Sequence, residues 1–355
     1  MAETLKQSVL QKVGECLYRH ASSNTYYALV KRNGKQVRKS LKTKDRKLAE
    51  RRLKDFREKV DRLATGGEAS SITFTEISDK WLDMKRPSLK EKSISRKQDN
   101  LKALRLHFGL HSVRKLTRSQ IDQWATKRSP EISASTYNKE REVLINVLAY
   151  AVREGILLEN CADHLARRKQ PKKELMIPSV EQFKTLIKVM RQLDVRYHPA
   201  ATLVELLAYS GMRLGEATAI LWENIDFEKQ TFTVTGGERG TKNLETRVVP
   251  LFPALESFLR RIWDEGVYSL SQRISQISNS KKAITKACEV AKIPHFNHHS
   301  MRHFFVSNAI EAGIDFKTIA AWVGHKDGGI LVAQTYGHLR DPHSHEMAKR
   351  MKVSA

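Results

Sequence analysis

A short stretch near the carboxyl end of this 355-residue chain gathers side chains that could cleave a phosphodiester bond. His299 and Arg302 are three residues apart in a segment whose apolar residues have helical spacing, so both side chains can share one helix face. His325 follows a second apolar segment, and Tyr336 comes eleven residues later, after a pair of glycines. We expect a histidine and an arginine that can bind one anion, with a tyrosine brought close to them.

Each of these residue types suits one part of phosphoryl transfer. An arginine fork binds phosphate through two parallel hydrogen bonds and stays charged at any relevant pH. A tyrosine hydroxyl is a nucleophile once its proton is removed, and histidines can donate hydrogen bonds to the developing charge. Any one of them alone is more often structural. The ordered set predicts a site that binds and attacks a phosphate.

This order, His-x-x-Arg, then Gly-His, then Tyr, closely resembles the carboxy-terminal signature of the tyrosine recombinases, the phage-type integrases. The family's earlier arginine matches Arg213 in the segment SGMRLGEATAIL, where Glu216 follows one helical turn later. The family's lysine lies on a β-hairpin and is matched best by Lys242 in TFTVTGGERGTKNLETRVVPL. The spacing between His325 and Tyr336 is longer than is usual in the family.

The resemblance implies a role for each matched residue. Four side chains would surround a DNA phosphate: Arg213, His299, Arg302 and His325. Tyr336 would attack that phosphate with help from His299 in proton transfer, and Lys242 would protonate the departing 5′ oxygen. Arg239 and Arg247 lie near Lys242 in the same hairpin region, so they are neighbouring candidates there.

Two cofactor sites were weighed against this interpretation. Four histidines cluster in the sequence, at positions 295, 298, 299 and 303. His299 and His303 have i, i+4 spacing, but no glutamate lies between them as in the zinc-protease motif, and no cysteine is near. Residues 237–242 lack the spacing of a nucleotide phosphate loop and sit between predicted strands. No metal and no cofactor is therefore expected.

The charge of the chain predicts a polyanionic partner. Its 63 Lys and Arg residues exceed its 39 acidic residues, which gives a formal net charge of +24. Residues 1–65 contribute +11 of this charge, so the excess is heaviest at the amino end. Three widely spaced cysteines favour a reducing compartment, and no window is apolar enough for a membrane span. We expect a cytoplasmic DNA-binding protein without a membrane segment.

The amino-terminal residues 1–65 are predicted to form a small domain with a sheet and one helix. Residues 25–42 have the pattern of two strands joined at Asn33-Gly34, and apolar residues with helical spacing follow over residues 45–64. This basic module resembles the arm-type DNA-binding domain of integrases. A solvated basic face without a ligand is the alternative. Residues 65–71 have the composition of a flexible linker.

The remaining residues are predicted to form two further domains, 73–170 and 176–355. Capping-box patterns at Thr73 and Thr117 and apolar periodicity predict a bundle of four helices, which the resemblance identifies as a core-binding domain. Two tryptophans there, Trp81 and Trp124, are expected in its core. The last domain is predicted to be a mixed α/β catalytic domain, so the fold class is mainly α with small β-sheets (α+β).

The sequence therefore predicts a site-specific recombinase of the integrase type. Its expected partners are double-stranded DNA attachment sites of the core type and the arm type, a homotetramer on DNA, and DNA-bending accessory proteins. We expect it in the bacterial cytoplasm, associated with the nucleoid. A type IB topoisomerase-like DNA relaxing enzyme and a catalytically silent DNA-binding regulator are the alternatives.

Overall fold

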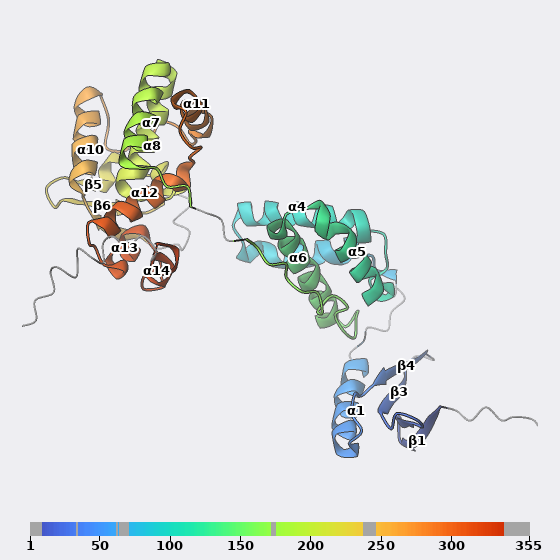
Figure 1. Cartoon of the computed structure of the whole chain (residues 1–355). Coiled ribbons are helices and arrows are strands. Elements are labelled where there is room, and N and C mark those ends of the chain that lie inside the picture. The colour runs from blue at the N-terminus through green and yellow to red at the C-terminus, as the bar shows by residue number, and fades with distance from the viewer. Residues whose placement is uncertain are drawn as a thin grey trace, which may run out of the picture. The chain divides into compact units, whose positions relative to one another are not determined.

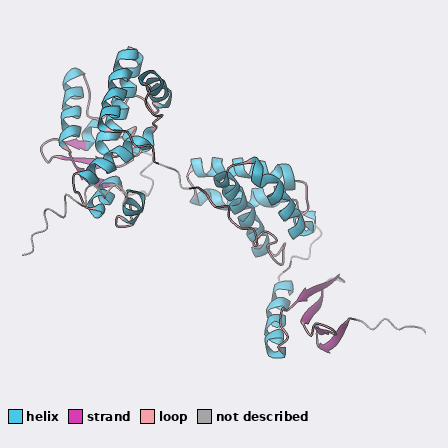
Figure 2. Cartoon of the chain, viewed as in Figure 1, coloured by secondary structure: helices cyan, strands magenta, loops and turns pink. Residues whose placement is uncertain are grey.

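Helices predominate in the protein, and its strands form two small antiparallel sheets (Figure 2), which confirms the predicted fold class. The structure is a computed structural model that describes residues 9–32, 35–61, 63, 71–171, 175–236 and 246–336. Two compact units, Met1–Lys172 and Lys173–Ala355, make up the chain. The finer division into three domains stays a prediction. No helix among the described residues is long and apolar enough to cross a membrane.

The first unit begins with a four-stranded antiparallel sheet in the order β1-β2-β3-β4, followed by one helix (Figure 1). The elements are β1 (Leu10–Gly14), β2 (Leu17–His20), β3 (Tyr26–Arg32), β4 (Lys35–Ser40) and α1 (Arg46–Asp61). The pairing of β3 with β4 confirms the predicted hairpin, although Asn33 and Gly34 lie outside the described residues. The first two strands were not predicted. Helix α1 buries Ala49, Leu53, Phe56 and Val60 in a core shared with the sheet.

Four helices with a separate core follow in the same unit, as the apolar periodicity predicted. They are α3 (Phe74–Lys85), α4 (Glu91–Phe108), α5 (Arg118–Glu131) and α6 (Ala134–Arg153). Thr73 and Thr117 each accept a hydrogen bond from the backbone N–H three residues on, and the side chains of Glu76 and Gln120 bond back to them. Both predicted capping boxes are therefore confirmed. Trp81 and Trp124 are buried in the core, also as predicted.

The second unit combines helices with a three-stranded antiparallel sheet in the order β5-β6-β7. Its first part contains α7 (Val180–Leu193), α8 (His198–Ser210), α9 (Leu214–Ala217), β5 (Ile225–Asp226), β6 (Thr231–Val234) and β7 (Arg247–Pro250). Its second part contains α10 (Pro253–Glu265), α11 (Lys281–Ala291), α12 (His298–Glu311), α13 (Phe316–Val323) and α14 (Ile330–Tyr336). The predicted hairpin strands on either side of Lys242 are thus present as β6 and β7.

Helix α12 holds the second unit together, because its apolar residues belong to two cores. Met301 and Phe304 pack in the larger core with α7 and α8, where the Phe304 ring stacks on Phe183 at a centroid distance of 4.9 Å. Phe305 and Ile310 pack in a smaller core with α13 and α14. Residues one turn apart on the remaining face are then held between these two cores. That face carries the side chains that could take part in a chemical reaction.

Candidate active site

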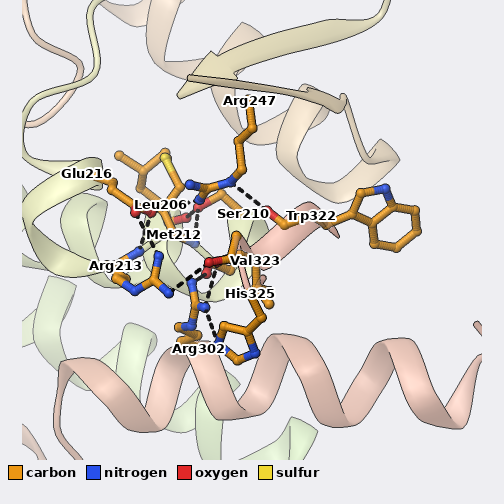
Figure 3. Close-up of polar contacts among 12 residues, drawn as sticks. Leu206, Ser210, Met212, Arg213, Glu216, Arg247, Arg302, Trp322, Val323 and His325 are labelled. Atoms are coloured by element: carbon orange, nitrogen blue, oxygen red, sulfur yellow. Dashed lines mark hydrogen bonds and ion pairs between the residues drawn. The ribbon is translucent and has the colours of Figure 1, made fainter. Parts of the chain in front are cut away.

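Arg302 is the buried centre of the candidate site, with 3% of its surface exposed. Its guanidinium projects from α12 and donates to the backbone carbonyls of Gly211 and Val323, each at 2.7 Å. A third hydrogen bond, 3.0 Å long, joins its Nη2 to Nε2 of His325 (Figure 3). None of these partners is a carboxylate. An arginine has five N–H donors, so two remain for a ligand after these three bonds.

The carbonyls that hold Arg302 come from the ends of two helices. Gly211 ends α8 and Gly324 ends α13, both with left-handed backbone, at φ +65° and φ +70°. The carboxyl end of a helix carries partial negative charge because its last carbonyls lack partners within the helix. A side chain at Gly211 would also meet the Phe305 ring, 2.4 Å from the position of its Cβ. The sequence therefore places glycine where a close approach and a left-handed turn coincide.

Arg213 approaches the same place from the start of α9. Its Nη2 donates to the Gly324 carbonyl at 3.1 Å, and its Nη1 donates to the carboxylate of Glu216 at 3.0 Å. Glu216 also accepts a bond from the backbone N–H of Arg213, so the carboxylate fixes both ends of that residue. Arg213 and Glu216 thus lie together as the sequence predicted, but Arg213 begins a helix of only four residues.

Arg247 is a third arginine at this place and comes from the first residue of β7. It donates to Glu216 at 2.7 Å and to the Trp322 carbonyl at 2.9 Å. Burial acts to raise the pKa of the Glu216 carboxyl, but Arg247 and Arg213 outweigh burial and hold that pKa below its ordinary value. Glu216 is therefore ionised and shared by two arginines. Its charge also favours the charged form of Arg302, but the hydrogen bonds of Arg302 go to other groups.

The charges at this place do not balance, because three guanidiniums converge around one carboxylate (Figure 3). Burial and then the nearby charge of Arg213 together lower the pKa of Arg302 to about 9, so the group is still charged at neutral pH. A buried charge without a partner of opposite sign costs free energy. The arrangement therefore favours an anion as the missing partner.

His325 adds a hydrogen-bond donor, the N–H at Nδ1, because its contact with Arg302 fixes the tautomer of the ring. Its Nε2 lies against Arg302, and because a guanidinium can only donate, Nε2 must accept. Burial lowers the pKa of His325 to about 4, with Arg302 and Arg213 adding to the effect, so the ring is neutral and carries its proton on Nδ1. This buried Nδ1 has no hydrogen-bond partner among the described residues. It is available to an oxygen of a bound anion.

Tyr336 is the last residue of α14, and 5% of its surface is exposed. Two glycines with positive φ, Gly328 and Gly329, precede this helix where the sequence predicted a break. The hydroxyl contacts Nδ1 of His303 in a hydrogen bond. Burial raises the pKa of Tyr336 although the charge of Arg302 opposes this. The predicted nucleophile therefore lies beside the arginines and histidines, as a neutral phenol.

His299 occupies the first turn of α12, on the solvent side of the site. Its ring meets the ring of His303 edge to face, with centroids 4.4 Å apart. Its pKa is lowered by the loss of water around the ring, then by Arg302 and Arg213, although the residue as a whole is still exposed. The structure thus brings His299 close to Arg302 and to Tyr336, with His303 between it and the tyrosine.

Lys242 lies outside the described residues, so its predicted role stays a prediction. The register of β6 and β7 nevertheless shows where the strands on either side of it end. Val234 of β6 pairs with Arg247 of β7, and Arg247 contacts Glu216. The two strands that flank this segment therefore end beside the candidate site.

Sequence reasoning assigned no role in the site to His303 or Arg247. His303 was considered only as a metal ligand, yet its place one turn after His299 and next to Arg302 puts it on the same helix face. Arg247 was noted only as a neighbour of Lys242, and nothing local signals its bond to Glu216. Among the described residues, no three His, Cys, Asp or Glu side chains converge as metal ligands.

Comparisons with known proteins give consistent results. Residues 179–343 match the phage integrase family, and residues 73–129 match the N-terminal SAM-like domain of phage integrases. Tyrosine recombinase XerA of Pyrococcus furiosus is 27% identical over 222 residues, which cover 59% of this chain and 74% of that protein.

Two solved structures of lambda integrase share the fold. One is a dimer bound to a COC′ core site, with a TM-score of 0.64 and 15% identity over 97% of this chain and 98% of the other. The second is a tetramer bound to a Holliday junction, with a TM-score of 0.61 and 16% identity over 90% of this chain and 98% of the other. The likeness thus extends over most of the chain.

Proposed function

Since the chain belongs to the phage integrase family of tyrosine recombinases, we propose that it cleaves and rejoins DNA at specific sites through a 3′-phosphotyrosyl intermediate. In this way it integrates or excises a mobile element. The observation that carries the proposal is Arg302, a buried cation whose hydrogen bonds reach no carboxylate among the described residues. A DNA phosphate supplies the missing negative charge.

In this proposal each group around that phosphate has a role. Arg302 and Arg213 bind the non-bridging oxygens, since guanidiniums suit phosphate in geometry and charge. The unpaired Nδ1–H of His325 donates to one of the same oxygens. These donors are in place before DNA arrives, and donors fixed in advance stabilise developing charge without the cost of reorganisation. His299 lies at the solvent side and assists proton transfer.

The chemical step exchanges one phosphodiester for another. The Tyr336 oxygen forms a bond to phosphorus, and the bond from phosphorus to the 5′ oxygen of the DNA breaks. The 5′ oxygen leaves as a hydroxyl after it takes a proton from Lys242. Because the phosphotyrosine keeps the energy of the original bond, the reverse attack by a 5′ hydroxyl rejoins the strand without a nucleotide cofactor.

The rest of the chain supplies DNA contacts and assembly. We assign core-type sites to residues 73–170 and arm-type sites to the basic residues 1–65, with catalysis in residues 176–355. Four copies act together on paired sites, a proposal supported by the fold shared with the lambda integrase tetramer on a Holliday junction. DNA-bending accessory proteins assist the assembly, and the protein works in the bacterial cytoplasm at the nucleoid.

A nicked suicide substrate tests the chemistry directly. The strand 5′ to the scissile phosphate carries a label, and the products are separated on a denaturing gel and mapped by peptide. Wild type is expected to trap a covalent adduct on Tyr336 and to leave a free 5′ hydroxyl on the other fragment. Tyr336→Phe is expected to give no adduct while DNA affinity changes little, because phosphate contacts are spread over many residues.

Other outcomes of this experiment favour the alternatives. An adduct on a different tyrosine, or one that persists in Tyr336→Phe, would show that the nucleophile is wrong. Relaxation of supercoiled plasmid without exchange between paired sites would favour a topoisomerase-like enzyme. Specific DNA binding with no adduct in the wild type would favour a silent regulator.

A further inference from the structure

The Tyr336 hydroxyl, the group that would attack DNA, shares a hydrogen bond with Nδ1 of His303. The two rings are 5.5 Å apart between centroids. We infer that His303 is a catalytic residue that accepts the proton of Tyr336 as the tyrosine attacks the phosphate. This inference deepens the function proposed above and rests on it.

The geometry favours His303 over the other histidines of the site. His299 is one turn earlier on α12, and its ring contacts the ring of His303 from the solvent side. His325 is already engaged, since its Nε2 accepts from Arg302 and its Nδ1 carries a proton. Among the described residues, the tyrosine hydroxyl forms its hydrogen bond with His303. Of the three histidine rings at the site, the ring of His303 is the one that contacts the reacting oxygen.

The protonation state of His303 suits the acceptor role. The role requires the tautomer in which Nδ1 holds the lone pair and Nε2 carries the proton, and in that tautomer the tyrosine O–H donates to Nδ1. Burial, and to a lesser extent His299 and Arg302, lower the pKa of His303 to about 4. The ring is therefore neutral throughout the physiological pH range, and the acceptor nitrogen is always available.

A base of this strength accepts the proton only when the attack is under way. Burial raises the pKa of the Tyr336 phenol, so transfer to His303 is strongly unfavourable beforehand. As the oxygen bonds to phosphorus it loses electron density, and its proton becomes far more acidic than in free tyrosine. A phosphate bound at Arg302 also offsets a charge that disfavours protonated His303. Proton transfer is thereby coupled to the presence of DNA.

The complete step balances in atoms and charge. A bond forms between the Tyr336 oxygen and phosphorus, and the bond from phosphorus to the 5′ oxygen breaks. The hydroxyl proton moves to Nδ1 of His303, while the 5′ oxygen takes a separate proton from Lys242. When the strand is rejoined, His303 returns its proton to the departing tyrosine oxygen.

Two substitutions separate proton acceptance from placement of the tyrosine. His303→Phe keeps an aromatic ring but removes the acceptor. His303→Asn provides an amide oxygen that can accept the hydroxyl bond but cannot take the proton. Single-turnover adduct formation on the full-length chain is expected to fall by about 10²–10⁴-fold in both variants. DNA affinity is expected to be unchanged, since both replacements are neutral like the original ring.

The matched control is His295→Phe, because His295 is an exposed histidine of the same region whose ring bonds to Thr285 on α11. It is expected to form adduct at the wild-type rate. Near wild-type rates in His303→Asn would overturn the inference and make His303 a positioning residue. Wild-type rates in His303→Phe would also overturn it. Thermal melting identifies a variant that fails to fold, in which case the other variant decides.

A second substrate tells the base from the acid. When sulfur replaces the bridging 5′ oxygen, the leaving thiolate needs no proton, so loss of the general acid is rescued and loss of the base is not. Both His303 variants are expected to stay slow on this substrate, and rescue would overturn the inference. If Tyr336→Phe abolishes the adduct but the His303 variants are unaffected, only this inference fails. If wild type forms no adduct on Tyr336, the proposed function itself fails.

Discussion

Two arginines, the partly buried Arg128 in the helical bundle and the buried Arg302 in the candidate site, differ in the groups that their guanidiniums bind. Arg128 on α5 bonds to both carboxylate oxygens of the buried Glu140, at 2.9 and 2.8 Å, and these bonds raise its pKa. Arg302 bonds to two carbonyls and one neutral histidine, and its pKa is lowered. The first charge is neutralised within the fold. The second is kept for a ligand.

The largest effect is expected from Arg302→Met. Loss of the central guanidinium should reduce single-turnover cleavage by about 10²–10³-fold or more. The unfolding free energy should change by less than about 1 kcal/mol, because removing an unpaired buried charge offsets the loss of donors to two neutral carbonyls. Adduct formation and chemical denaturation measure the two quantities. A large loss of stability would contradict the contrast with Arg128.

Arg128→Met is expected to give the opposite result. It leaves Glu140 buried without its bidentate partner, so the unfolding free energy of the bundle should fall by about 2–3 kcal/mol. Cleavage by the folded protein should be nearly unchanged. Combining Arg128→Met with Glu140→Leu should recover most of the stability, because neither charge is then left alone. If the double variant does not recover the unfolding free energy, Arg128 stabilises the bundle by more than its ion pair with Glu140.

Gly324→Ala tests the helix end that holds the arginines. Alanine at φ +70° costs about 1–2 kcal/mol, and its Cβ would lie 2.9 Å from the Arg247 guanidinium. The matched control is Gly328→Ala, which has similar strain at φ +65° but no atom within 4 Å of the added carbon. Both variants should have a lower melting temperature than wild type, whereas only Gly324→Ala should also cleave DNA more slowly. Equal cleavage rates in the two variants would show that the position of Arg247 does not affect cleavage.

The smallest effect is expected from pH. His303 and His325 have pKa values near 4, well below the ordinary value for histidine, so both stay neutral as the pH falls from 8 to 5.5. Single-turnover cleavage of bound DNA should show no histidine titration near pH 6.5. Between about pH 6.5 and 4 the unfolded chain binds protons that the folded chain does not. Thermal stability should therefore decline over this interval as pH falls, and a steep loss of cleavage at pH 6.5 would contradict these assignments.

The sequence predicted the parts of the molecule that depend on local pattern. Local sequence patterns predicted the capping boxes at Thr73 and Thr117 and the apolar spacing of the bundle helices. The order of the candidate site residues was likewise visible in the sequence. The strands β1 and β2 were missed, since five and four residues with mixed burial give little periodicity. Short strands of this kind are defined mainly by their pairing partners.

The contacts that complete the site could not be predicted, because they join distant segments. The bond from Arg302 to the Gly211 carbonyl spans 91 positions and that from Arg213 to Gly324 spans 111. Backbone carbonyls have no side-chain identity, so no pattern marks them as acceptors. The bond between His303 and Tyr336 likewise depends on how α14 packs against α12.

Backbone acceptors also determine how the site can change through mutation. The carbonyls of Gly211, Val323 and Gly324 that orient Arg302 and Arg213 are common to every amino acid, so a side-chain substitution cannot delete them. A site built on carboxylate partners would lose an acceptor with one codon change. Here the orientation of Arg302 is exposed to mutation chiefly at the two glycines that shape the helix ends, whereas Arg213 also depends on the carboxylate of Glu216. Side chains elsewhere in the chain can therefore diverge while the backbone acceptors that hold Arg302 persist.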